Sequence, residues 1–152
     1  SNAVTHLIKK YLNGTWWLLP GNGKMKGNYV FIDDVINGHI LAMQKGMKGQ
    51  QYILGGENAS YLKFFHLIRN LSHRKYPLIP VPVPAMIVFA AVQMVISRMV
   101  GKAPLLPPKW VKKYMYNWEL SSLKATEELG YSVTPLNKGL HLTIEWIKSH
   151  YQ

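Results

Sequence analysis

The apolar residues of this chain recur mainly at steps of three and four, with short apolar runs between these periodic segments. Steps of three and four place side chains on one face of a helix, whereas short apolar runs are typical of buried strands. Four prolines between positions 76 and 84 exclude a helix there and predict an extended segment. The pattern predicts helices over 4–13, 35–45, 61–72, 85–100, 107–115, 122–130 and 136–150, and strands over 16–19, 29–32 and 51–54.

The segment from residue 28 to residue 56 has the clearest organisation. The apolar run 29–32 predicts a strand, and helical spacing follows it directly. Asp33 and Asp34 stand between the two, where a carboxylate can accept hydrogen bonds from the free N–H groups of a helix N-terminus. We therefore interpret both aspartates as structural cap residues and not as an acid–base pair. With the strand at 51–54 the segment makes a strand–helix–strand unit, which is typical of a parallel α/β sheet.

The predicted helix 85–100 is unusually apolar. Only Gln93 and Ser97 interrupt its apolar surface before Arg98, and the two lie one turn apart on a single stripe. Such a helix packs inside a protein, lines an apolar pocket or lies on a membrane surface. It is too short to cross a bilayer, which requires about 20 apolar residues. Lysines follow it at 102, 109, 112 and 113, where they can meet lipid head groups or simply face water.

Composition predicts one globular domain. The chain has 152 residues, of which 48% are hydrophobic and 16% charged. Residues 1–3 are interpreted as the remnant of an expression tag, which leaves 4–152 as a single domain. The absence of cysteine excludes disulfides and thiolate metal sites, and the six histidines lack zinc-site spacing, so we expect no metal. The net charge is +11, but the basic residues are scattered without a nucleic-acid-binding motif, and we do not expect nucleic-acid binding.

Two ordered blocks of residues resemble a known family. The first runs from Tyr29 through Val35, Gly38-His39-Ile40 and Tyr52 to Asn58. The second comprises Ser121 to Ala125, Glu128 to Tyr131, Pro135-Leu136, Gly139-Leu140, Thr143 and Trp146. Together they resemble the C-terminal, substrate-binding half of extended short-chain dehydrogenases/reductases, the NAD-dependent epimerase/dehydratase family, and most closely its dihydroflavonol-reductase-like branch.

The resemblance implies an α/β fold: a helix-rich C-terminal lobe with a few short, mostly parallel strands, lacking the Rossmann half. Members bind NAD or NADP at a Gly-rich turn after the first strand and use a tyrosine with a lysine four residues later. None of the nine tyrosines here has that lysine. The only Gly-rich loop that resembles the fingerprint, Gly21 to Gly27, has its third glycine one place late. We therefore expect this chain alone to bind no cofactor and to be non-catalytic.

The resemblance also bears on the substrate. Nucleotide-sugar epimerases typically carry an arginine and an aspartate just before the central strand, and the arginine holds a substrate phosphate. Gly27-Asn28 stands there in this chain, which favours a small, apolar hydroxyl or carbonyl substrate over a nucleotide sugar. The residues we predict to line its site are Asn28, Met86, Phe89, Trp110 and Tyr114. The alternative is that Asn28 only begins a strand and the aromatic residues belong to the core.

Two functional hypotheses follow. The first is the substrate-binding portion of an NAD(P)-dependent epimerase/dehydratase or reductase. The second is a small peripheral membrane-binding or lipid-carrying module that uses the apolar helix 85–100. Both are compatible with a cytoplasmic location, peripheral at the inner membrane face in the second case. Because half of a parallel sheet leaves an open edge and an uncovered apolar face, we also predict that the chain forms a homo-oligomer.

Overall fold

The computed structural model describes residues 3–101, 111 and 113–151. Its helices are α1 (Ala3–Leu12), α2 (Ile32–Lys45), α3 (Tyr61–Ser72), α4 (Val83–Val100), α6 (Leu123–Leu129) and α7 (Leu136–Tyr151), with a 3₁₀ turn at Lys113–Met115. Its strands are β1 (Leu18–Pro20), β2 (Lys26–Tyr29), β3 (Glu57–Ser60) and β4 (Ile79–Val81). The predicted helix-rich α/β fold with a few short strands is confirmed.

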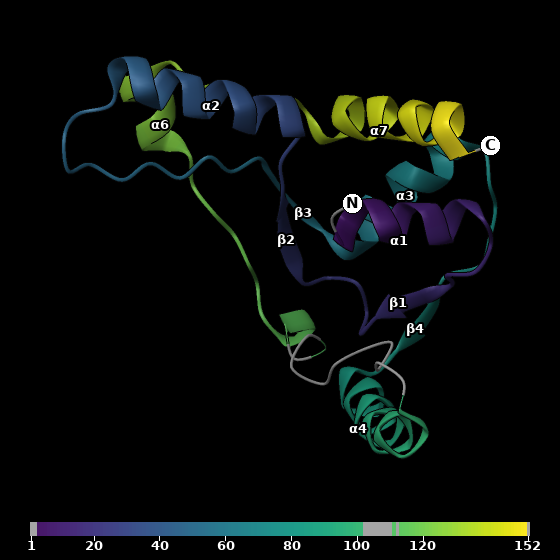
Figure 1. Cartoon of the computed structure of the whole chain (residues 1–152). Helices are drawn as coiled ribbons and strands as arrows, with labels where there is room; N and C mark the ends of the chain where they lie inside the picture. The colour runs from purple at the N-terminus through teal and green to yellow at the C-terminus, as the bar shows by residue number, and fades with distance from the viewer. Residues whose placement is uncertain (1–2, 102–110, 112, 152) are drawn as a thin grey trace.

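The strands form two separate pairs. β1 pairs in parallel with β4, and β2 pairs antiparallel with β3, with Asn28 opposite Asn58 and Tyr29 opposite Glu57. Figure 1 shows the β2–β3 pair leading up to the ends of α2 and α7, while β1 and β4 lie on the side of α4. The strands were expected to be mostly parallel, and of the two pairs among the described residues one is parallel and one is antiparallel.

Two predicted strand positions are wrong. The strand expected at 29–32 lies earlier, at Lys26–Tyr29, because helix α2 already begins at Ile32. Residues 51–54 are not a strand at all. A strand requires a neighbour that accepts and donates its backbone hydrogen bonds, and within the described residues no strand pairs with 51–54. The predicted strand–helix–strand unit is thus a strand and a helix followed by irregular chain.

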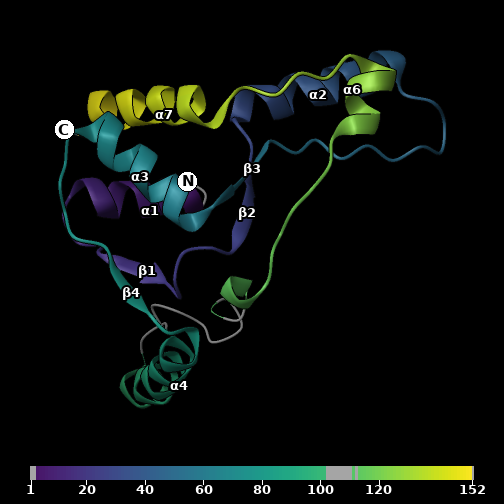
Figure 2. The ribbon, with the colours of Figure 1, turned by 180° about the vertical axis from the view of Figure 1, so that it is seen from behind.

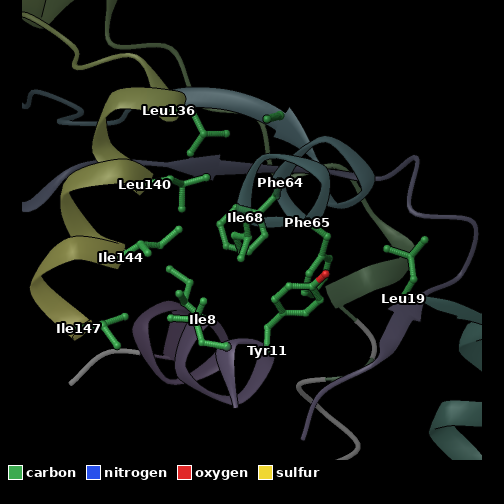
Figure 3. Packing of buried hydrophobic residues seen from close by; sticks show 12 residues of the cluster. Ile8, Tyr11, Leu19, Phe64, Phe65, Ile68, Leu136, Leu140, Ile144 and Ile147 are labelled. Atoms are coloured by element: carbon green, nitrogen blue, oxygen red, sulfur yellow. The ribbon is translucent and has the colours of Figure 1, made fainter. Parts of the chain in front are cut away.

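The main core joins both ends of the sequence. Helices α1, α3 and α7 point their apolar faces at one another, and Ile8, Tyr11, Phe64, Ile68 and Ile144 are almost completely buried there. Figure 3 shows these side chains converging from the three helices. The predicted apolar stripe of the last helix supplies one wall of this core, which comprises Leu136, Leu140, Ile144 and Ile147.

Local signals set several helix ends as predicted. Ser60 is the N-cap of α3, and its hydroxyl accepts a hydrogen bond from the Lys63 N–H. His73 ends α3 and Gly130 ends α6, both with left-handed backbone. The predicted helix 107–115 falls largely outside the described residues, and its described end is the 3₁₀ turn.

Helix α4 stands apart from this core. Figures 1 and 2 show it beyond β4, on the side of the molecule opposite α2 and α7. It packs through Val83, Met86 and Ala90 against Val111 in a small separate cluster. None of the described helices is both long and apolar enough to cross a membrane.

Candidate functional site

A groove of about 770 Å³ lies where α1, the β2–α2 junction and α7 meet. Its wall is mostly apolar, and Asn28, Asp33 and Thr143 are among the few polar groups that line it. A largely apolar cavity with a few polar groups is the usual form of a small-molecule site. The apolar part of the wall includes Ile8, Val30, Phe31, Ile32, Phe64, Leu136, Leu140, Leu142 and Trp146.

A buried carboxylate fixes the α2 side of this groove. Asp34 is 7% exposed and accepts hydrogen bonds from both the backbone N–H and the hydroxyl of Thr134, each at 2.7 Å. These bonds join the first turn of α2 to the segment that enters α7. The prediction that an aspartate caps α2 is therefore wrong: the N-cap is Phe31, with no side-chain cap, and Asp33 is exposed.

A second carboxylate fixes the α7 side. Glu57 accepts a 2.9 Å hydrogen bond from the Leu136 N–H, the first of α7, and forms a 2.6 Å ion pair with Lys63. The hydrogen bond from Lys63, together with that from Leu136, lowers the pKa of Glu57. Because Glu57 lies on β3, this one side chain couples a strand to the first turns of α3 and α7.

Asn28 lines the groove but is committed to the backbone around it. Its amide oxygen accepts from the Gly56 N–H at 2.8 Å, and its amide nitrogen donates to the Gly56 carbonyl at 2.9 Å and to Asn58 Oδ1 at 2.8 Å. The residue therefore closes the β2–β3 pair at its open end. Both amide hydrogens and the amide oxygen of Asn28 therefore make hydrogen bonds within the protein, as the structural alternative for this residue requires.

The other residues predicted to bind substrate do not gather around this groove. Met86 is buried on the inner face of α4, and Tyr114 packs against the same small cluster. Phe89 is 64% exposed on the outer face of α4. Trp110 lies outside the described residues. The sequence prediction thus combined residues from different places: Asn28 at the groove, Met86 and Tyr114 in the cluster under α4, and Phe89 on the outer face of α4.

Three tyrosines belong to the groove and to this cluster: Tyr29 lines the groove, Tyr114 packs against the cluster under α4, and Tyr61 contacts Tyr114. The ring of Tyr61 meets the ring of Tyr114 edge-on at 5.0 Å, and Tyr29 stacks on Phe64 at 4.5 Å. Burial raises the pKa of Tyr29 strongly and that of Tyr61 to about 12, and it also raises the pKa of Tyr114. A catalytic phenol in an oxidoreductase needs a lowered pKa, so the environment of these tyrosines acts in the opposite direction.

Sequence reasoning missed the rim of the groove on α7. Leu142 and Trp146 are 42% and 46% exposed, and they lie one turn apart on the side of α7 away from the core. The sequence signal that could have indicated this rim is the second stripe of large apolar side chains on the predicted last helix. Among the described residues no three potential ligand side chains gather closely enough to hold a metal ion.

The exposed face of α2 continues this apolar surface. Ile32, Ile36, Ile40 and Met43 are each between 46% and 88% exposed and recur at steps of three and four. Single exposed apolar residues are common, but a continuous stripe along a helix marks a surface that meets another surface.

Comparison with known proteins finds relatives whose family is known. No family model matches the chain. It is 28% identical over 127 residues to "Putative dihydroflavonol 4-reductase" of Synechocystis sp., an alignment that covers 81% of this chain and 37% of that protein. It is also 28% identical over 160 residues to short-chain dehydrogenase/reductase family 42E member 1 of Bos taurus, covering 97% of this chain and 40% of that protein.

Solved structures agree with this relationship. The crystal structure of gox2253 matches 99% of this chain and 44% of its own with a TM-score of 0.75 at 27% identity. UDP-glucuronic acid 4-epimerase from Bacillus cereus in complex with NAD matches 99% and 40% with a TM-score of 0.66; at 22% identity this likeness shows the fold alone. The chain thus spans about two fifths of the length of the relatives it matches. The resemblance seen in the sequence is confirmed.

Proposed function

Because the chain resembles part of an extended short-chain dehydrogenase/reductase in both sequence and fold, we propose that it is the substrate-binding portion of an NAD(P)-dependent reductase or epimerase/dehydratase. Residues 4–152 act in this proposal as one substrate-binding domain that is not catalytic alone. One solved structure of the same fold, UDP-glucuronic acid 4-epimerase from Bacillus cereus, contains bound NAD. A cofactor-binding part would supply hydride transfer, and this chain would hold the substrate.

The observation that carries the proposal is the uncovered apolar stripe of α2. In α/β proteins the helices that follow sheet strands are covered by the sheet they cross. Here Ile36 and Ile40 are 50% and 46% exposed, and the neighbouring residues 51–54 have no strand beside them within the described part of the chain. A cofactor-binding domain with a parallel sheet fits both features, because it offers a strand edge and an apolar face together.

The groove beside α2 supports a small, largely apolar substrate. Its apolar walls and few polar groups suit a compound with a single hydroxyl or carbonyl group. Gly27 offers no side chain to hold a phosphate. Asn28 belongs to this groove. Met86, Phe89 and Tyr114 remain proposed contacts on the α4 side of the chain, and Trp110, also a proposed contact, lies outside the described residues.

Reconstitution from two polypeptides tests the proposal. The cofactor-binding part of the Synechocystis relative, produced separately, is titrated with this chain and followed by calorimetry. We expect a complex that Ile36→Glu on α2 abolishes and Ile96→Glu on α4 leaves intact, since the two isoleucines are 50% and 55% exposed on different helices. The proposed role of α2 would be contradicted if both variants still formed the complex, or if both variants lost it equally.

Without a cofactor-binding partner the same face should drive self-association. Light scattering at low micromolar protein should show a homodimer or larger oligomer for the chain alone. Ile36→Glu should shift it towards the monomer. A wild-type monomer at this concentration would show that the exposed stripe of α2 tolerates water and needs no partner.

A second candidate function is a peripheral membrane-binding or lipid-carrying module, cytoplasmic and located at the inner membrane face. The outward-facing apolar residues of α4, Phe89 at 64% exposed and Met99 at 83% exposed among them, favour it. Co-sedimentation of the chain with vesicles that mix phosphatidylglycerol with phosphatidylcholine tests this candidate independently of α2.

A further inference from the structure

A small cavity lies where the carboxyl ends of α1, α3 and α7 meet. Its volume is about 310 Å³. The residues that line it are Leu12, Ser72, His73, Arg74 and Lys148. Figures 1 and 2 show the three helix ends on the same side of the molecule, next to the label C. This cavity shares no lining residue with the groove beside α2, so the two are separate sites.

The walls of this cavity are basic. Arg74 and Lys148 bring positive charges to it from two different helix ends, and His73 adds an imidazole. No aspartate or glutamate is among the described residues that line it. Glu145 forms a 3.2 Å ion pair with Lys148, but the two side chains are 55% and 39% exposed, and water weakens such a pair. Lys148 can therefore interact with a second anion.

The basic residues at these helix ends are more numerous than the helices themselves require. The carboxyl end of a helix carries about half a negative charge, so one basic residue at each end already compensates it. Six lysines and arginines lie in the last turns of the three helices or directly after them. They are Lys9, Lys10, Arg69, Arg74, Lys75 and Lys148. A surplus of positive charge remains around the cavity and attracts an anion from solution.

Hydrogen-bond donors inside the cavity suit an anion with several oxygens. Ser72 is only 8% exposed, and its Oγ accepts a 3.3 Å hydrogen bond from the Arg74 N–H. Because this Oγ donates to no described residue, its hydroxyl hydrogen is available to a ligand. His73 has a left-handed backbone directly after the helical Ser72. A step of this kind turns successive N–H groups towards one point, which is the geometry of an anion-binding nest.

We propose that this cavity binds the phosphate group of inorganic phosphate or of a small phosphate ester. A guanidinium can donate two parallel hydrogen bonds to phosphate oxygens, an ammonium adds a compact charge, and a hydroxyl donates one further bond. Arg74, Lys148 and Ser72 supply these three groups. Leu12 belongs both to this cavity and to the main core, so a bound phosphate joins α1, α3 and α7 where that core ends.

Titration of the whole chain with inorganic phosphate tests the site. Thermal unfolding is followed by scanning fluorimetry in a neutral, phosphate-free buffer, with sodium chloride at equal ionic strength as the control. A ligand that binds only the folded state stabilises it, so phosphate at about twenty times its dissociation constant should raise the melting temperature by about 4–7 °C. Chloride should give a smaller rise without saturation, because it only screens the net charge of +11.

Substitutions locate the bound phosphate. Arg74→Gln and Lys148→Gln should each weaken phosphate binding about fivefold in calorimetry, and Ser72→Ala about threefold. Lys24→Gln is the matched control, because it removes one positive charge from an exposed lysine just before β2 and should leave the affinity unchanged. Far-UV circular dichroism checks that each variant is folded.

Glycerol 3-phosphate, titrated in the same way, distinguishes the two sources of the phosphate group. Binding tighter than that of inorganic phosphate would identify an ester as the ligand, and equal or weaker binding would identify the free ion; both support the site.

Three results would overturn the proposal. The first is a rise in melting temperature that chloride reproduces. The second is saturable binding that Arg74→Gln and Lys148→Gln both leave unchanged, and the third is equal weakening by Lys24→Gln. Because the cavity and the groove share no residue, each of these results leaves the proposed substrate-binding function standing.

Discussion

The link between Asp34 and Thr134 gives the sharpest prediction of stability. The two hydrogen bonds, each 2.7 Å long, join α2 to the segment before α7 across one side of the groove. Hydrogen bonds to a charged group contribute about 1.5–3 kcal/mol each, and a buried donor left without a partner costs about 1–3 kcal/mol. Asp34→Asn keeps one acceptor oxygen, so we expect a loss of about 1.5–3 kcal/mol. Asp34→Ala leaves the Thr134 N–H without its partner, and we expect the larger loss, about 3–5 kcal/mol.

Asp33 provides the matched control. It precedes Asp34 in the same helical turn and is exposed, so Asp33→Asn removes the same charge from the same helix end without breaking the link. Urea unfolding followed by circular dichroism measures both variants. A double-mutant cycle of Asp34→Asn with Thr134→Val should give a coupling of about 0.5–3 kcal/mol. Equal losses for Asp33→Asn and Asp34→Asn would refute the link, because helix-end charge alone would then explain the effect.

Three other predictions concern backbone packing, pH and cofactor. Gly56→Ala should lower the free energy of unfolding in urea by about 1–3 kcal/mol or more, because a Cβ there overlaps the Tyr29 backbone carbonyl. At Gly139 a Cβ meets only ordinary contacts, so Gly139→Ala should be neutral or stabilising by about 0.5–1 kcal/mol. Because the pKa of Glu57 is lowered in the fold, its contribution is present above the usual glutamate range and is lost as pH falls through the lowered value. The stability difference between wild type and Glu57→Gln should therefore shrink in acid titrations, and a constant difference would exclude the carboxylate. The chain alone should give no saturable NADH or NADPH signal in fluorescence titration, and micromolar binding would show that a cofactor site had been overlooked.

Elements specified by neighbouring residues could be predicted from the sequence. Apolar residues at steps of three and four, with Ser60 as the N-cap, were enough to predict α3. The apolar stripe from Leu136 to Ile147 was enough to predict α7. The apolar character of α4 was also visible, although the sequence alone could not show that Gln93 and Ser97 face inward. That orientation depends on which side of α4 packs against Val111.

Elements specified by distant residues could not be predicted. β2 and β3 have the sequences KGNY and ENAS, which carry no strand pattern, yet they pair in antiparallel fashion. Asn28 on β2 bonds Asn58 on β3 and Gly56 just before it. Residues 51–54 have a strand-like sequence without a partner beside them. The groove was missed for the same reason, since its walls come from α1, the start of α2 and α7.

The contact between α1 and α7 has a consequence for how the chain folds during synthesis. Ile8 and Tyr11 complete their core only when Ile144 and Ile147 arrive, more than 130 positions later. Such distant contacts slow folding, because a long loop must close before its residues gain any burial. We expect α1 to remain incompletely packed until α7 has been synthesised. Deleting the last two turns of α7 should therefore release α1 as well, and a protease should then cleave first at α1.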